Sequence, residues 1–286
     1  MIPNRDMAQA VTNWAGYQEN VRVAILTSTR ANPHAPVDAL SDYDIELYVR
    51  DLEPFLQGDD WLGAFGKVIA RDPYRPKLFD DGIRVWRLAM FEDAPRVDFN
   101  IQLLSVIEED ITQYGGYSCD MGYRILLDKD GLTRGAREPT YCEYDTPKPS
   151  REQFEDLTNE FWWDITYVTK YLRRDEFYFA KWMLDAHLHH HFLFTLLSWY
   201  AGAACDWSSN PGARGRWLSK ILERETWEDV LETFAGPDPE DNWQAMHAMA
   251  ETFGRIGAEL GEKLGYDYPA QVERDVTSWL RTVQAS

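Results

Sequence analysis

Two aspartates separated by a single tyrosine begin an apolar stretch of this sequence, "DYDIELYV" at 42 to 49. Successive side chains of a β-strand point to opposite faces, so the alternation of apolar and polar residues predicts a strand. Its core face would carry Tyr43, Ile45, Leu47 and Val49. Asp42, Asp44 and Glu46 would then share the other face, with the two aspartates as neighbours across one pleat.

A third aspartate lies in another alternating stretch, "RVDFNIQ" at 96 to 102. Val97, Phe99 and Ile101 predict the buried face of a strand, which leaves Asp98 and Asn100 on the opposite face. If this strand lies close to the strand at 43 to 49 in one sheet, Asp98 meets the aspartate pair and three carboxylates share one place.

Three carboxylates in one place indicate chemistry with a divalent cation. Two neighbouring carboxylates repel, and each raises the pKa of the other unless a cation lies between them. Mg²⁺ prefers hard oxygen ligands, usually one or two carboxylates with phosphate oxygens and water. Such a site suits phosphoryl or nucleotidyl transfer, in which a third carboxylate accepts the proton of the attacking hydroxyl. Asp42, Asp44 and Asp98 are therefore the candidate metal ligands and catalytic residues.

The spacing of the surrounding elements narrows this interpretation, because an isolated Asp-x-Asp pair often occurs by chance. A predicted strand, "VRVAIL" at 21 to 26, is followed by the hydroxyl pair Ser28-Thr29, and a loop then leads to Asp42. A strand with Asp98 follows later. This order resembles the nucleotidyltransferase superfamily related to DNA polymerase beta, in which Gly-Ser or Gly-Gly normally stands where this chain has Ser28-Thr29.

The resemblance extends to one family of that superfamily. "STRANPHAPVDALSDYDI" resembles the Gly-Ser-Arg-x-Asn-Pro and Asp-Tyr-Asp-Ile segments of the aminoglycoside 6-adenylyltransferases, also called streptomycin adenylyltransferases. Further segments are similar to that family in the same order, so that the resemblance runs from about residue 5 to about residue 282. They are "RVDFNIQLL", "ILLDKDGL", "EFWWDITYVTKYLRRDE", "AKWMLD", "LSWYAG" and "LGYDYP".

The resemblance implies an α+β fold: an N-terminal polymerase beta-like nucleotidyltransferase domain with a mixed sheet, followed by an all-α C-terminal helical bundle. It implies Mg²⁺-dependent transfer of AMP from ATP to a hydroxyl of a streptomycin-like aminoglycoside, with release of pyrophosphate, and hence antibiotic resistance. Asp42 and Asp44 would hold Mg²⁺ and the triphosphate, and Asp98 would be the general base. The residues alone leave three alternatives open: another cationic acceptor, a protein hydroxyl, or a non-catalytic relative that binds nucleotide or aminoglycoside.

Serine at position 28 departs from the family pattern. Glycine tolerates positive φ and lets backbone amides approach a phosphate, whereas serine adds a Cβ. We expect Ser28 to keep an ordinary dihedral angle and to donate, with Thr29, to the triphosphate; the alternative is weakened nucleotide binding. Arg30 has two equal interpretations, as a phosphate ligand or as a structural tie to Asp38 or Asp42.

The helical half adds one candidate ligand of the triphosphate. Lys170 lies in "YVTKYLRRDE", where the resemblance places a lysine over the nucleotide; Lys181 is a weaker candidate, and an exposed lysine paired with an acid is the alternative. His187 and His191 are spaced to meet on one helix face, but no third metal ligand is defined, so a structural cluster is expected. A guanidinium-bearing sugar would suit the aromatic and acidic residues nearby, namely Trp162, Trp163, Asp164, Asp175 and Glu176.

Composition sets the class of protein. The 29 basic and 48 acidic residues give a net charge of −19, which disfavours nucleic acid and anionic membranes and favours cationic ligands. Taken alone, however, the charge is better explained by an acidic surface that serves solubility. The three cysteines, Cys119, Cys142 and Cys205, form no Cys-x-x-Cys pair, which fits a reducing compartment. The N-terminal residues carry no export signal and no stretch is long enough to cross a membrane, so a cytoplasmic location is expected.

The pattern of the chain predicts two domains, 1–148 and 149–286. In the first, helices are expected at 7–18 and 59–70, strands at 21–26, 43–49 and in "YRILLD", and a hairpin from "IRVWRLAMF" and "RVDFNIQLL" around "EDAP". After "EYDTPKPSREQF" the pattern is helical to the end. One helix carries a stripe that we interpret as core: Trp243, Met246, Ala250, Phe253, Ile256, Gly257, Leu260 and Leu264.

Overall fold

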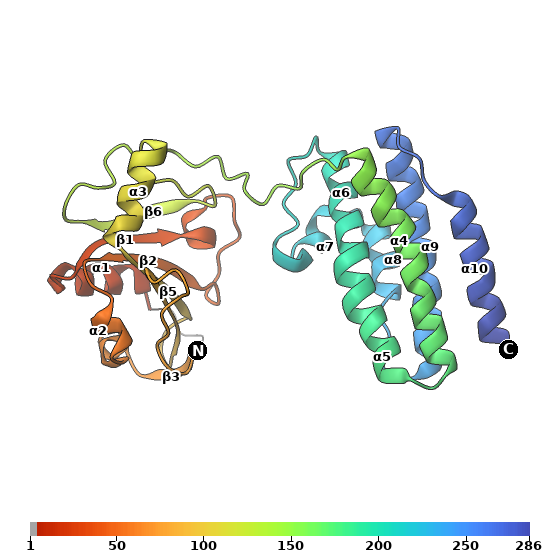
Figure 1. The fold of residues 1–286 in the computed structure, drawn as a ribbon, viewed down its shortest axis with the longest axis horizontal. Coiled ribbons are helices and arrows are strands. Elements are labelled where there is room, and N and C mark those ends of the chain that lie inside the picture. Colours follow the sequence, from red (N-terminus) through yellow and green to blue (C-terminus); the bar gives the residue numbers. More distant parts are fainter. Residues whose placement is uncertain (1–4) are drawn as a thin grey trace. The chain divides into compact units, whose positions relative to one another are not determined.

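The structure is a computed structural model that describes residues 5–286. The chain divides into two compact units, Met1–Glu143 and Tyr144–Ser286. In Figure 1 the first is drawn in red to yellow-green and the second in green to blue. The first unit contains a sheet with helices and the second is helical, so the predicted α+β class is confirmed.

The first unit is built on one six-stranded sheet of order β3-β4-β5-β2-β1-β6. Its strands are β1 (Val21–Thr27), β2 (Tyr43–Val49), β3 (Val68–Asp72), β4 (Arg84–Phe91), β5 (Val97–Leu103) and β6 (Tyr123–Asp128). β2 and β5 are parallel, and the other neighbouring strands are antiparallel. The sheet is therefore mixed, as predicted.

The two faces of the sheet have different cover. One face packs against α1 (Met7–Tyr17), α2 (Glu53–Leu56) and the 3-10 helix η2 (Asp60–Phe65), and it takes the alternate apolar residues of β2, β4 and β5. α3 (Leu104–Tyr114) packs on the other face through Ile107, which clusters with Val23, Ile25, Tyr48 and Tyr117. α3 begins where β5 ends, so it covers that end of the face. The beginnings of β2 and β5, with the aspartates, lie at the opposite end.

Most predicted elements of this unit are present. The helix at 7–18, the strands at 21–26 and 43–49, the strand "YRILLD" and the β4–β5 hairpin are confirmed. The helix predicted for 59–70 is wrong: the segment contains η2 and then β3. Gly66 interrupts it with φ +128°, and the residues after it pair with β4, where a β-branched pair such as Val68-Ile69 fits a sheet edge.

The second unit starts from a capped helix, α4 (Arg151–Arg173). The Ser150 side chain accepts from the Gln153 amide, and the Gln153 side chain accepts from the Ser150 amide, so two of the free donors at the helix start are satisfied. The remaining elements are α5 (Phe177–Trp182), the π-helix η3 (Met183–Leu193), α6 (Phe194–Ala204), η4 (Ala213–Gly215), α7 (Leu218–Ile221), α8 (Arg224–Glu232), α9 (Pro239–Leu264) and α10 (Ala270–Ala285).

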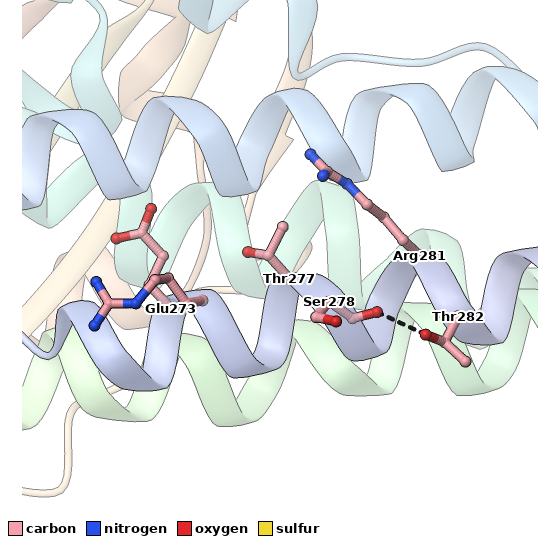
Figure 2. A pocket seen from close by; sticks show the side chains of 6 residues that line it. Glu273, Thr277, Ser278, Arg281 and Thr282 are labelled. Carbon is pink, nitrogen blue, oxygen red and sulfur yellow. Dashed lines mark hydrogen bonds between the residues drawn. The ribbon is translucent and has the colours of Figure 1, made fainter.

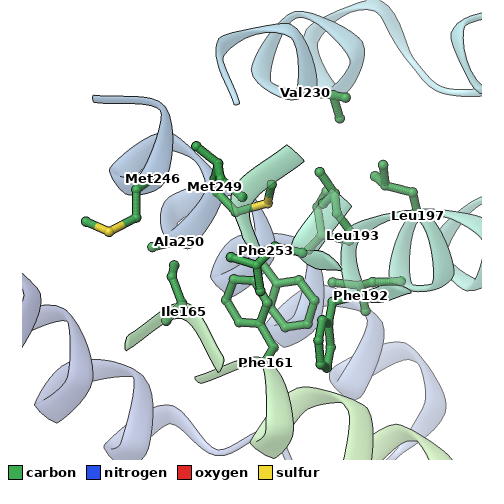
Figure 3. Packing of buried hydrophobic residues seen from close by; sticks show 14 of the residues in the cluster. Phe161, Ile165, Phe192, Leu193, Leu197, Val230, Met246, Met249, Ala250 and Phe253 are labelled. Carbon is green, nitrogen blue, oxygen red and sulfur yellow. The ribbon is translucent and has the colours of Figure 1, made fainter. Parts of the chain in front are cut away.

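The core of the second unit is aromatic at its centre. Phe161 of α4 and Phe253 of α9 stack with ring centroids 3.6 Å apart and planes 11° from parallel, and Phe192 of η3 packs beside Phe161 (Figure 3). The stripe predicted as core on α9 is confirmed, since all of it is buried apart from Leu264, which packs partly buried against the same cluster. Across residues 5–286, no helix is long and apolar enough to span a bilayer.

Candidate active site

The sheet brings Asp44 and Asp98 together. β2 and β5 run parallel in a register that pairs Asp44 with Asp98 and Glu46 with Asn100. Residues paired in this way point to the same face, and both aspartates lie on the face opposite the α1 core. Two catalytic candidates from separate segments of the sequence therefore stand on adjacent strands. Their assigned roles in catalysis stay predictions.

Arg96 holds the third aspartate beside them. Its guanidinium lies 2.7 Å from an Asp42 carboxylate oxygen and 2.9 Å from Asp98 Oδ1, and it donates to Asp98 Oδ2 at 3.0 Å. The Nε–H does not point at Oδ1, so this buried oxygen has no hydrogen bond although the two atoms are within ion-pair distance. Arg96 therefore partly neutralises Asp42 and Asp98 and leaves one buried oxygen unsatisfied.

The site raises the pKa values of its buried carboxyls. Burial, followed by the charges of Asp98 and Asp42, raises the pKa of Asp44 to about 6; a hydrogen bond from the Ser28 hydroxyl and the charge of Arg96 act in the opposite direction. Burial also raises the pKa of Asp98, against the lowering effect of Arg96. Burial is the largest cause for both residues, and repulsion among the carboxylates adds to it.

Ser28 does not have the ordinary dihedral angle that we expected. Its φ is +63°, in the left-handed region, where the chain leaves β1 and enters the 3-10 helix η1 (Ser28–Ala31). Its amide donates to the Gly122 carbonyl at 3.0 Å, and its hydroxyl acts to lower the pKa of Asp44. Glycine fits this conformation without strain, whereas a residue with Cβ is strained by about 1 kcal/mol. Donation from Ser28 and Thr29 to a triphosphate stays a prediction.

Arg30 makes the contacts of a structural tie, although not to the side chains that we considered. Its Nε and Nη2 donate to the backbone carbonyls of Asp38, Ser41 and Asp42, at 2.8 to 3.2 Å. Its guanidinium also lies 3.9 Å from the centroid of the Tyr43 ring. Arg30 therefore fixes the loop that leads into β2, and a phosphate contact of Arg30 stays a prediction.

Glu46 is a buried acid on the same face of β2, one pleat beyond Asp44. The hydroxyls of Tyr48 and Tyr117 both donate to its Oε2, at 2.8 and 2.9 Å, and burial raises its pKa. Because Tyr117 lies beyond α3 in the sequence, this network ties that segment to the middle of the sheet. Glu46 thus supports the strand that carries Asp44.

The donor set fits Mg²⁺, although the side chains do not stand in a metal-binding arrangement. Among residues 5–286, no three His, Cys, Asp or Glu side chains are grouped so as to hold a metal ion. The physical reason is Arg96, which bonds to Asp42 and Asp98 and occupies the space between them. Carboxylates at two strand ends, an unsatisfied buried oxygen and a raised pKa are nevertheless the chemistry that a hard cation would satisfy.

Lys170 belongs to the second unit. Its ammonium lies 4.5 Å from the centroid of the Tyr167 ring, and it lines a hollow between α4 and α10 together with Trp163, Asp275 and Trp279. A contact of Lys170 with a triphosphate stays a prediction. Lys181, the weaker candidate, donates to the Ala235 carbonyl and the Asn242 side chain and pairs with Asp185, so its role is structural.

The histidine-rich segment is a packed structural cluster. His187 Nε2 lies 2.6 Å from Asp164, His189 bonds to Leu184 and Thr233, and the His187 and His191 rings stack 5.7 Å apart.

The aromatic and acidic residues considered for a sugar lie in different environments. Trp162 is buried and donates to the Tyr268 hydroxyl, whereas Trp163 is exposed. Asp164 is thus already paired, and Asp175 and Glu176 are exposed at the end of α4.

A polar hollow on α10 is not a site of the same kind. Its lining residues all come from that helix and are exposed or half-exposed: Glu273, Arg274, Thr277, Ser278, Arg281 and Thr282 (Figure 2). The one hydrogen bond drawn there runs from the Thr282 hydroxyl to the Ser278 carbonyl and belongs to the helix itself. One helix face without a second wall does not enclose a ligand.

The sequence analysis did not identify two residues of the site: Arg96, and Gly122, whose carbonyl binds the Ser28 amide. Arg96 lies two residues before Asp98, so the alternation that placed Asp98 on the open face indicates the same face for Arg96. Gly122, with φ +106°, accepts the Ser28 amide immediately before β6, and nothing in the local sequence pattern indicates this long-range contact.

Comparisons with known sequences agree on one family. The family described as streptomycin adenylyltransferase matches residues 1–283. An aminoglycoside 6-adenylyltransferase of Bacillus subtilis (strain 168) is 26% identical over 289 residues, which cover 100% of this chain and 99% of that protein. One of Campylobacter jejuni is 28% identical, over 96% of this chain and 93% of its own. A crystal structure of an aminoglycoside 6-adenyltransferase from Bacillus subtilis aligns over 99% of this chain and 100% of that chain, at 23% identity and a TM-score of 0.47. Because the family match spans nearly the whole sequence, this chain belongs to the streptomycin adenylyltransferase family.

Proposed function

We propose that this protein transfers AMP from ATP to a hydroxyl of an aminoglycoside of the streptomycin type and releases pyrophosphate. The observation that carries the proposal is the register of β2 and β5, which sets Asp44 opposite Asp98 on one open face. Members of the family named as aminoglycoside 6-adenylyltransferases support the choice of acceptor. A cell that contains this activity would be resistant to the antibiotic, because the protein modifies it.

Asp98 is the proposed general base. It takes the proton of the acceptor hydroxyl while the acceptor oxygen bonds to the α-phosphorus. The bond from that phosphorus to the bridging oxygen breaks, and pyrophosphate leaves with the electron pair. Without a metal ion, burial raises the pKa of Asp98 above that of a free aspartate, and a bound cation would lower it.

Asp42 and Asp44, with Asp98, are the proposed ligands of Mg²⁺. When bound, Mg²⁺ would neutralise the triphosphate and the charge that develops during transfer. Ser28 and Thr29 follow directly on the end of β1, whose Thr27 pairs with Asp44, and would lie along the leaving phosphates. Lys170 is the proposed contribution of the helical unit to the triphosphate.

The deciding experiment measures pyrophosphate release with ATP, Mg²⁺ and streptomycin, together with the mass of the product. We expect an increase in the mass of streptomycin by one AMP. Asp98→Asn should lower kcat by roughly 10²- to 10⁴-fold because general-base catalysis is lost, and Asp44→Asn should abolish turnover. Asp60→Asn is the matched control, since this exposed aspartate lies in η2 against the opposite face of the sheet.

The results separate the proposal from its alternatives. Acceptor-dependent release that is unchanged in Asp44→Asn would reject the site. No AMP adduct on any member of an aminoglycoside panel would reject the acceptor, even if the protein binds ATP.

A further inference from the structure

The open face of the sheet continues past Asp98 onto β4, where it becomes aromatic. β4 pairs with β5 so that Leu88 stands opposite Asp98 and Trp86 opposite Asn100. Directly opposed residues point to the same face, and the alternate residues of β4, such as Val85 and Ala89, are buried on the other face. Trp86 therefore shares the face of the catalytic aspartates, one pleat away from Asp98 and with an alpha-carbon separation of roughly 7–8 Å.

Trp86 is exposed but held in place. Its side chain is 48% exposed, and its indole N–H donates to the Asn100 side chain at 3.1 Å. The Phe79 ring meets it edge to face with ring centroids 4.8 Å apart. The segment that carries Phe79 is fixed to β4 by the bridge of Leu78 with Val85 and by the bond from the Phe79 amide to the Arg84 carbonyl at 2.9 Å. We call Trp86 and Phe79 the aromatic platform.

The platform borders a hollow of about 280 Å³, which is also lined by Pro73, Lys77, Leu78 and Asp80. Packing of the core does not explain why Trp86 is held in this orientation, because about half of the residue is exposed. Trp86 offers the ring type that binds cations best, on the strand next to the one that carries Asp98.

The order of the strands assigns an occupant. Across the sheet, β1 with Ser28 is followed by β2 with Asp44, β5 with Asp98 and β4 with Trp86. In an in-line transfer the attacking and leaving oxygens lie on opposite sides of the phosphorus. If the leaving phosphates lie along β1, the acceptor hydroxyl lies at β5, and the body of the acceptor extends over β4.

We propose that the aromatic platform binds a cationic ring of the acceptor and so determines which aminoglycosides this protein modifies. The inference rests on the proposed function and adds the location of the acceptor. A guanidinium or ammonium group of the acceptor lies on the face of Trp86. Asp80 and Lys77 both line the hollow and offset each other's charge, so the attraction comes from the ring.

The test compares the full-length wild type with Trp86→Ala and Trp86→Phe. For Trp86→Ala we expect the KM for streptomycin to rise roughly tenfold, as loss of a cation–π contact predicts, with the KM for ATP within twofold of wild type. Trp86→Phe keeps a ring but loses the bond to Asn100, and it should lie between the two. Calorimetry of streptomycin binding, with a non-hydrolysable ATP analogue present, should show the same order of affinities without turnover.

Tyr17→Ala is the matched control, because Tyr17 is an exposed aromatic residue at the end of α1 and should change neither KM. Unfolding curves monitored by circular dichroism establish that each variant is folded. If the wild type turns over streptomycin but Trp86→Ala keeps its KM and affinity for it, the platform proposal is wrong. A rise in the KM for ATP instead would assign the platform to the nucleotide and also overturn the proposal. A wild type that does not turn over any aminoglycoside would mean that the proposed function itself has failed.

Discussion

The ionised form of Asp44 is destabilised by its surroundings when no metal ion is bound. Its pKa rises from the usual 3.8 to about 6, first because of burial and then because of Asp98 and Asp42. The folded protein therefore binds this proton more tightly than the unfolded chain does. The resulting stabilisation is fully present below pH 3.8 and is lost as the pH rises through 6.

This sign leads to a prediction for Asp44→Asn without metal. At pH 8, in the presence of a chelator, the variant should be more stable than the wild type by about 2 kcal/mol, because a buried charge is replaced by a neutral amide of the same shape. The difference should shrink towards zero near pH 4. Urea unfolding across this pH range measures it, and Asp60→Asn should show no such trend. An equal difference at pH 4 and pH 8 would contradict the raised pKa.

Arg96 competes with a metal ion for the same two carboxylates. A divalent cation that binds Asp42 and Asp98 must displace the guanidinium, because both interact with the same carboxylates. Arg96→Gln should therefore bind Mn²⁺ more tightly than the wild type in the absence of nucleotide, by roughly tenfold. Titration followed by the electron paramagnetic resonance of free Mn²⁺ measures this affinity.

Arg96→Lys keeps the positive charge and is the matched variant, with an expected affinity close to that of the wild type. Weaker Mn²⁺ binding by Arg96→Gln would show that Arg96 supports the metal site instead of competing with it. In that case the aspartates would need the arginine to keep their positions.

At the scale of elements, alternation predicted which residues share a face but not which strands are neighbours. The two-residue period of "DYDIELYV" and "RVDFNIQ" placed Asp44 and Asp98 correctly on polar faces. Their meeting depends on β5 lying parallel to β2, and the chain reaches that position through β3 and β4. No local pattern encodes this arrangement. The sequence therefore predicts that Asp98 meets Asp44 only if these two strands are neighbours.

The two errors have tertiary causes. The segment 59–70 carries helix-compatible residues, yet pairing with β4 favours a strand after Gly66, so a tertiary contact overrides local propensity. The conformation of Ser28 follows from the Gly122 carbonyl, which comes from a remote part of the chain. Trp86, in contrast, was within reach: the same alternation that buried Val85 and Ala89 predicts that Trp86 faces the side of Asp98.

At the scale of the whole molecule, the net charge suits the cationic acceptor that we propose. A net charge of −19 attracts cationic ligands over distances of about a Debye length and raises their local concentration. This attraction is general, because it acts on any polyamine. Discrimination among cations must come from contacts at short range, such as those of the aromatic platform.

The two units have separate hydrophobic cores, and this leads to the last prediction. The core of Tyr144–Ser286 consists of residues of α4, η3, α6, α7, α8, α9 and α10, and none of its described members belongs to the sheet unit. A fragment of residues 144–286 should therefore fold alone, with a helical circular dichroism spectrum and one cooperative thermal transition.

Phe253→Ala in this fragment removes one ring of the stacked pair with Phe161 and should lower its stability by about 3–5 kcal/mol. Trp163→Ala, which truncates an exposed ring on α4, should have little effect. A fragment without a cooperative transition would show that the helical unit needs the sheet unit to fold.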